Sequence, residues 1–109
     1  MTLARRHWDP GLGPLQLATL RRTLEREGMV TAWWSDVPGT SVPVHAHAFP
    51  ETRWMVEGYL RVTVGNEQVE LGPGDRLDLP PNLPHATEVI GLGQAIYVSG
   101  TMERGKVGM

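Results

Sequence analysis

Two histidines and a glutamate stand close together in the stretch GTSVPVHAHAFPETRWMVEG, residues 39–58. His45 and His47 are two residues apart, and in a β-strand this spacing sends both imidazoles to the same face. Glu51 follows a proline that suits a turn, so its carboxylate can return beside them on the next strand. His85 begins a later strand, where an inward side chain can add a third nitrogen. The spacing therefore predicts a metal site.

Three neutral imidazoles and one carboxylate suit a single divalent transition metal, and they do not choose among Mn, Fe, Co, Ni, Cu and Zn. The chain has no cysteine, which excludes thiolate ligands and disulfides. Four protein ligands on a six-coordinate ion leave two positions for water, substrate or dioxygen, as a catalytic site requires. The alternative is a buried, hydrogen-bonded cluster of the same four side chains without a metal.

The composition indicates one domain that handles small molecules. A chain of 109 residues is long enough for one hydrophobic core and too short for two. The net charge of -2 gives no electrostatic footprint for nucleic acid or an anionic membrane. The N-terminal MTLARRHWDPG lacks the apolar segment of a secretion signal, and no apolar run reaches membrane-spanning length. We therefore expect a cytoplasmic protein without nucleic-acid or membrane partners.

Thirteen glycines and nine prolines indicate many tight turns, which favours an all-β fold of short strands. Residues 14–27 differ, because apolar residues recur there with a helical period. The apolar stripe consists of Leu17, Leu20 and Leu24. Pro14 suits the first turn of this amphipathic helix and Gly28 its C-terminal end. We expect the helix to cover one face of a sheet, since no second helix follows to form a helix-turn-helix.

After Gly28, every apolar run is short and ends at glycine, proline or asparagine, which is typical of β-strands. The expected strands span residues 29–36, 41–48, 52–57, 59–64, 68–71, 76–79, 85–90 and 94–99. The chain then divides into an N-terminal arm and helix at 1–28, a barrel at 29–100 and a tail at 101–109, all within one domain.

The stretch with the two histidines resembles the first conserved motif of the cupins, G(x)5HxH(x)3E(x)6G. Its five defined positions are met by Gly39, His45, His47, Glu51 and Gly58. The resemblance implies a small bacterial cupin, with a jelly-roll β-barrel (double-stranded β-helix) around a metal held by His45, His47, Glu51 and His85.

The second cupin motif, G(x)5PxG(x)2H(x)3N, is similar to the chain at Gly74, Pro80 and His85. Asn82 replaces the usual glycine, which is a mild change because asparagine also tolerates a left-handed turn conformation. Val89 replaces the usual asparagine. Asparagine at that position contributes to the active site of some cupins, so Val89 implies a less polar cavity here.

Alternation along the strands predicts which side chains line the cavity. Residues of the same parity as Glu51, His45 or His85 are expected to point inward, together with one apolar wall residue. The predicted pocket consists of Ser41, Pro43, Arg53, Met55, Leu79, Thr87 and Val89.

Arg53 is the most suggestive of these residues, because an inward guanidinium beside a metal ligand can clamp the carboxylate or another anionic group of a ligand. The alternative is that strand twist carries Arg53 to the rim, where it pairs with a surface acid such as Glu57 or Asp78.

The strand expected at 29–36 is apolar on both faces, and the chain has four tryptophans. Both faces should therefore be covered, which favours a homodimer. The competing interpretation is that the helix at 14–27 covers these side chains without a second subunit.

Two function classes remain open. As an enzyme, the protein acts on a small organic acid or carbonyl compound at the metal, with dioxygenase-, decarboxylase- or isomerase-like chemistry, as similar small cupins do. As a binding module, it senses or sequesters a small ligand without changing it. Apart from the metal ligands, the sequence contains no arrangement that indicates a nucleophile or a general base.

Overall fold

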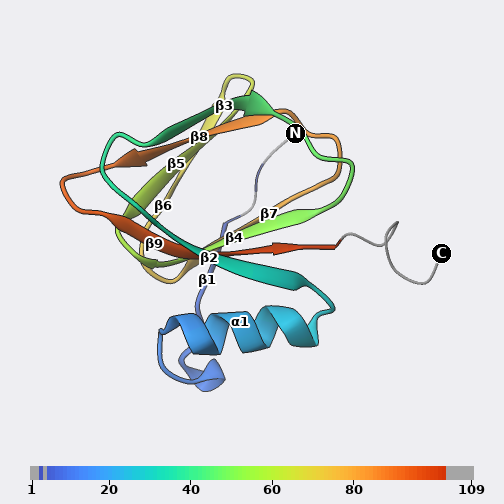
Figure 1. Cartoon of the computed structure of the whole chain (residues 1–109), viewed down its shortest axis with the longest axis vertical. Helices are drawn as coiled ribbons and strands as arrows, with labels where there is room; N and C mark the ends of the chain where they lie inside the picture. The colour runs from blue at the N-terminus through green and yellow to red at the C-terminus, as the bar shows by residue number, and fades with distance from the viewer. Residues whose placement is uncertain (1–2, 4, 103–109) are drawn as a thin grey trace.

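The computed structural model describes residue 3 and residues 5–102, and this part folds into two antiparallel sheets with one α-helix outside them (Figure 1). One sheet has five strands in the order β1-β7-β4-β9-β2, and the other has four in the order β3-β8-β5-β6. The strands are β1 Arg5–His7, β2 Val30–Asp36, β3 Ser41–His45, β4 Glu51–Glu57, β5 Tyr59–Val64, β6 Glu67–Leu71, β7 Asp75–Leu79, β8 His85–Ile90 and β9 Ala95–Thr101. The predicted all-β architecture with an N-terminal helix is confirmed.

One strand is shorter than expected, because the strand placed at 41–48 ends at His45. Its partner β8 begins at His85, which lies opposite His45. The residues before His85 form the proline-rich loop 80–84, and proline cannot donate to a sheet ladder. The ladder therefore stops at this pair, and His47 lies in a loop rather than on β3.

The two ends of the described chain also differ from expectation. The N-terminal arm forms the short strand β1, which pairs with β7 from Arg5↔Leu77 to His7↔Asp75. At the other end, Thr101 still belongs to β9. Of the rest of the predicted tail, Met102 follows the strand, and residues 103–109 lie outside the described residues.

The helix α1 spans Leu17–Arg26, so it begins three residues later than predicted. Gln16 has an extended backbone, so the helix cannot begin before Leu17. Pro14 therefore lies in the bend before the helix and not in its first turn. Gly28 ends the helical segment with a positive φ of 92°, as the sequence predicts. A short 3₁₀ turn, η1 at Pro10–Leu12, lies before α1, and Asp9 caps it.

The apolar residues divide into two clusters on opposite faces of the five-stranded sheet. The barrel core lies between the sheets and contains Met55, Leu60, Val62, Leu71, Leu77, Leu79, Val89 and Tyr97 among its buried residues. Outside the sheet, Leu20 and Leu24 of α1 pack on Trp54 and Val98. The leucine stripe therefore covers the sheet as expected. Among the described residues, no helix has the length and apolarity that a membrane crossing requires.

Gly58 shows why the turn between β4 and β5 needs glycine. Its φ is 78°, and a Cβ at this position would lie 2.3 Å from the carbonyl oxygen of Gln94. Any larger residue would push β4 away from the start of β9. The glycine that closes the first cupin motif thus holds the strand that begins with Glu51.

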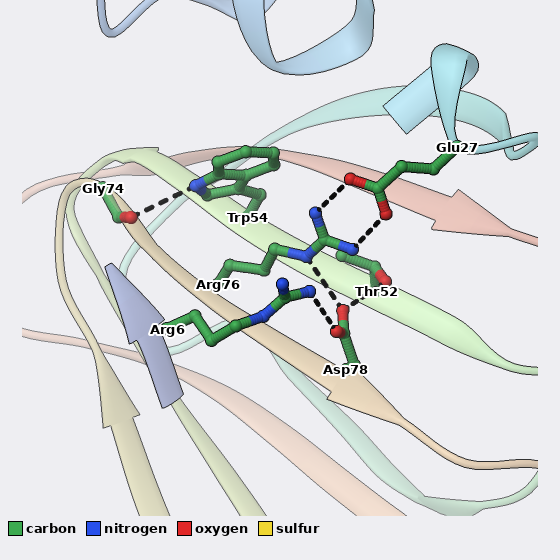
Figure 2. A network of polar contacts seen from close by, with 7 residues as sticks. All are labelled: Arg6, Glu27, Thr52, Trp54, Gly74, Arg76 and Asp78. Carbon is green, nitrogen blue, oxygen red and sulfur yellow. Dashed lines mark hydrogen bonds and ion pairs between the residues drawn. The ribbon is translucent and has the colours of Figure 1, made fainter. Parts of the chain in front are cut away.

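A polar network ties α1 and β1 to the outer face of the same sheet (Figure 2). Arg76 on β7 donates to both carboxylate oxygens of Glu27, at 2.8 and 2.7 Å, and to Asp78 at 3.0 Å. Its guanidinium also lies 5.1 Å from the ring centroid of Trp54. Asp78 accepts further hydrogen bonds from Thr52 and Arg6. The network thus joins the helix end, the arm and two strands.

The two carboxylates of this network make stability depend on pH. The hydrogen bond from Arg76 lowers the pKa of Glu27. Burial alone would raise the pKa of Asp78, but hydrogen bonds from Thr52 and Arg76 outweigh it and lower that pKa. Because both pKa values are depressed in the folded state, the stabilisation is fully present above pH about 4.5. It is lost as pH falls through the folded-state values.

We therefore expect the melting temperature to fall when pH is lowered from 5 towards 2.5, and less steeply in Glu27→Gln. At pH 7 this variant should lose about 1 kcal/mol, or about 4 °C, since the ion pair is partly exposed to solvent. Calorimetry across this pH range measures both effects. Glu57→Gln, at an exposed carboxylate outside the described ion pairs, should match the parent profile. Identical profiles for Glu27→Gln and the parent would contradict the assignment.

Candidate metal centre

The four predicted ligands meet at one end of the barrel. His45 is the last residue of β3, His85 the first of β8 and Glu51 the first of β4, while His47 comes from the loop between β3 and β4. Each offers one donor atom, and these atoms all lie within 4.8 Å of one another. The structure therefore brings together the complete set of residues that the motif spacing selected.

Backbone carbonyls orient two of the imidazoles. The Nδ1 atom of His45 lies 2.9 Å from the carbonyl oxygen of Pro43, and that of His85 lies 2.8 Å from the carbonyl oxygen of Leu83. A carbonyl only accepts hydrogen bonds, so each Nδ1 carries a proton, and in the neutral imidazole the lone pair is then on Nε2. This is the tautomer that a metal-binding histidine needs.

The loop that carries His47 is fixed by two contacts. The backbone N–H of Asn82 donates to the carbonyl oxygen of His47 at 2.6 Å. Asn82 has a φ of 63°, the left-handed conformation expected for an asparagine in place of the motif glycine. The ring of Phe49 stacks on that of His47, with 5.2 Å between the centroids and 9° between the planes. His47 is thereby held beside the other ligands without a strand.

Two of the buried atoms that could bind a metal have no hydrogen-bond partner within the described chain. They are Oε1 of Glu51 and Nε2 of His85, which lie 3.3 Å apart. Buried polar atoms are normally paired, so these two need a partner of another kind. A cation between them would satisfy both, and the residues therefore fit a metal better than a closed hydrogen-bonded cluster.

Arg53 lies inside, next to this centre. Its side chain is only 13% exposed, and its Nη1 lies 3.2 Å from Oε2 of Glu51. The guanidinium carbon also lies 5.8 Å from the ring centroid of Tyr97. Arg53 is thus not at the rim beside Glu57 or Asp78, because alternation along β4 keeps it on the face of Glu51.

A cavity of about 430 Å³ opens beside the centre. It is lined by Val30, Thr31, Ala32, Trp34, His47, Phe49, Glu51, Arg53, Ser99 and Thr101. Of the predicted pocket residues, only Arg53 lines this cavity. Sequence reasoning missed the wall from β2 and β9, since nothing in the sequence shows that these two strands pair.

The other predicted pocket residues lie elsewhere. Ser41 and Pro43 are exposed, because a register shift between Val42 and His45 breaks the alternation along β3. Met55, Leu79 and Val89 are inward but belong to the barrel core. Thr87 is buried on β8, also outside the lining of the cavity. Pro43 still serves the centre, through the carbonyl that orients His45.

Hydrogen bonds fix the wall that β2 and β9 contribute. Nε1 of Trp34 donates to Oγ of Ser99 at 3.0 Å, which holds the indole against the cavity. The hydroxyl of Tyr97 donates to Asp36 at 2.7 Å. Burial, together with this hydrogen bond, raises the pKa of Tyr97, so the phenol stays protonated at neutral pH.

The cupin domain family matches residues 32–100, more than half of the chain, and the chain therefore belongs to the cupin family. The predicted jelly-roll barrel is thus confirmed. No curated protein matches the chain.

Solved structures share the barrel. An uncharacterised conserved protein with a double-stranded β-helix domain from Klebsiella pneumoniae has a TM-score of 0.61 and 25% identity, over 67% of this chain and 65% of that one. TT1209 from Thermus thermophilus has a TM-score of 0.60 and 27% identity, over 67% and 71%. DMSP lyase DddQ from Ruegeria pomeroyi has a TM-score of 0.62 and 23% identity, over 74% of this chain and 40% of that one.

We expect the protein, purified without a nickel resin, to carry one equivalent of a divalent transition metal by elemental analysis. His85→Ala should lose most of that metal, because it removes a buried donor. At a free metal concentration one hundred times the Kd, binding should add about 2.7 kcal/mol to the free energy of unfolding. Calorimetry of the metal-free and reloaded protein tests this.

The matched control is His7→Ala, since His7 is exposed on β1 and pairs with Asp75 rather than with the cluster. This variant should keep its metal. A metal-free parent protein that also rejects added Mn, Fe, Co, Ni, Cu and Zn would contradict the metal centre.

Proposed function

We propose that this cupin binds one divalent transition metal at His45, His47, Glu51 and His85 and acts there on a small organic molecule. The convergence of the four donor atoms, two of them buried and unpaired, carries the proposal. When bound, the ion supplies a Lewis acid with coordination positions that the four protein ligands leave open.

Arg53 favours an anionic substrate. Among the described residues, its Nη1 lies within ion-pair distance of Glu51, and a guanidinium has further N–H donors that this contact does not use. A carboxylate can take two of those donors side by side. Because Arg53 is largely buried, such a bond is weakly screened by water. Arg53 would therefore bind and orient the anionic group beside the metal.

The remaining lining favours an apolar body on the same substrate. Trp34, Phe49, Val30 and Ala32 contribute apolar surface, and Ser99 and Thr101 contribute hydroxyls. Cavities with mostly apolar walls and a few polar points are typical of small-molecule sites. The best-supported substrate class is a small organic acid with an apolar or aromatic part.

The reaction is best placed among dioxygenase-, decarboxylase- and isomerase-like chemistry, since an open metal coordination sphere suits each of these. A protein of similar fold is described as a DMSP lyase, but at 23% identity that likeness carries the fold alone. It does not select a reaction for this chain.

One observation favours a second candidate, a non-catalytic module that binds a small ligand. Apart from His47 and Glu51, the described residues that line the cavity include no histidine or carboxylate. A reaction that needs a separately placed acid or base would lack that group. Ligand binding without turnover makes no such demand.

Turnover separates the two candidates. The iron-loaded protein should consume oxygen with at least one member of a panel of keto acids, diketones and catechols. Anaerobic reactions with the other divalent metals, followed by mass spectrometry, test decarboxylation and isomerisation. Ligands that raise the melting temperature without any turnover across both panels would favour the binding module.

Arg53→Met should weaken the binding of acidic ligands about tenfold to a hundredfold and leave the metal content unchanged. The reason is the loss of charge-assisted hydrogen bonds, worth about 1.5–3 kcal/mol. Isothermal titration with the metal-loaded variant measures the loss. Arg61→Met is the matched control, because Arg61 on β5 pairs with Glu70 and Glu88 away from the cavity. Equal affinity in Arg53→Met and the parent would remove the anion-binding role.

A further inference from the structure

The strand β2 has one edge without a partner in the described chain. On its inner side it pairs with β9 in an uninterrupted register of seven residues, from Val30↔Thr101 to Asp36↔Ala95. It is the last strand of the five-stranded sheet, so its other edge presents free N–H and C=O groups. Such an edge is a template for pairing with another strand.

The other three edge strands carry features that hinder such pairing, whereas β2 carries only one charge, Asp36 at its end. The strand β1 has only three residues, two of them arginines. The strand β3 contains Pro43 and a register shift. The strand β6 carries Glu67 and Glu70. Short length, charge, proline and irregular register are the devices that protect sheet edges. β2 has seven residues in regular register without proline, lysine or arginine.

The side chains of β2 are apolar and exposed on both faces of the sheet. Val30 is 62% exposed and Trp34 49% on the cavity face, while Trp33 is 52% exposed on the face of α1. The helix packs on Trp54 and Val98 and leaves Trp33 half exposed. The helix therefore contacts β2 at Thr31, through Arg21 and Glu25, but does not cover its exposed tryptophans as one interpretation of the sequence required.

We propose that β2 pairs antiparallel with β2 of a second copy of this chain, so that two five-stranded sheets join into one. Trp33 is the middle residue of the strand, and a twofold axis there pairs all seven residues. Asp36, the only charged residue of β2, then lies opposite Val30 rather than opposite itself. No like charges meet, and Trp33 packs against Trp33 of the second copy. This self-complementarity selects a second copy as the occupant.

The pairing also completes the candidate site. Val30, Ala32 and Trp34 line the cavity, and in this register Trp34 of the second copy lies opposite Ala32. Directly opposed residues of an antiparallel pair have Cβ atoms about 5 Å apart. The indole of the second copy therefore borders the cavity at its Ala32 wall. The inference does not depend on the metal or on the reaction.

The mass of the full chain at micromolar concentration tests the proposal, by light scattering or sedimentation. We expect the mass of two chains. Trp33→Lys places two positive charges opposite each other at the axis and should weaken the dimer at least about tenfold. Val44→Lys is the matched control, since Val44 is an exposed apolar residue on the edge strand β3, and it should remain dimeric. A one-chain mass for the parent would overturn the proposal.

A second variant keeps the test valid if Trp33→Lys fails to fold. The chain contains no cysteine, so Trp33→Cys can form a disulfide only between two chains. Under mild oxidation it should crosslink into a dimer, and Val44→Cys should not. A dimer in which Val44→Cys crosslinks and Trp33→Cys does not would place the interface on β3 and overturn the β2 pairing.

Discussion

The buried carboxylate of Glu51 is the constraint on which the site depends. Glu51 is only 6% exposed, and a buried carboxylate needs a cation or hydrogen-bond donors nearby. The guanidinium of Arg53 lies beside it, and three imidazoles complete a cluster drawn from two sheets and a loop, which a bound cation would satisfy. Much of the local structure holds those partners: the carbonyls of Pro43 and Leu83 turn two rings, and Asn82 and Phe49 hold the third. The barrel end thus gathers four metal-binding atoms, three imidazole nitrogens and one carboxylate oxygen, around one point.

The strand β4 connects this centre to the outside of the molecule. Its inward residues are Glu51, Arg53 and Met55, while Thr52 and Trp54 point outward into the network of Arg76. Because successive side chains of a strand face opposite ways, the network behind the sheet fixes the backbone that carries the site. The helix and the arm contribute to the site in this way without touching it. The N-terminal segment, which lies outside the family match at residues 32–100, therefore acts on the site through β4.

The sequence predicted the parts that depend on local pattern, and it failed where long-range register decides. Short apolar runs between glycine and proline indicated each of the barrel strands, and the motif spacing selected all four cluster residues. Alternation placed Arg53 correctly because β4 is regular in that part. Alternation misplaced Ser41, because the register shift in β3 cannot be seen in the sequence SVPVH. It also placed His47 on β3, although that strand ends at His45, opposite the end of the proline-rich loop. The wall containing Trp34 and Ser99 depends on the pairing of β2 with β9, between which most of the chain intervenes.

The composition of the cavity limits the chemistry more than the fold does. The polar groups that line it, beyond the ligands, are Arg53 and the hydroxyls of Ser99 and Thr101, since the hydroxyl of Thr31 is bonded to Glu25 and Arg21 of α1. The phenol of Tyr97 is held by Asp36, and its raised pKa keeps the proton on it. A mechanism that moves protons between two separate side chains, such as epimerisation or hydrolysis, is therefore poorly served. A mechanism in which the protein binds an acid and orients it beside the metal site fits the residues that are present. The same residues would serve a binding module equally well, so turnover rather than affinity distinguishes the two.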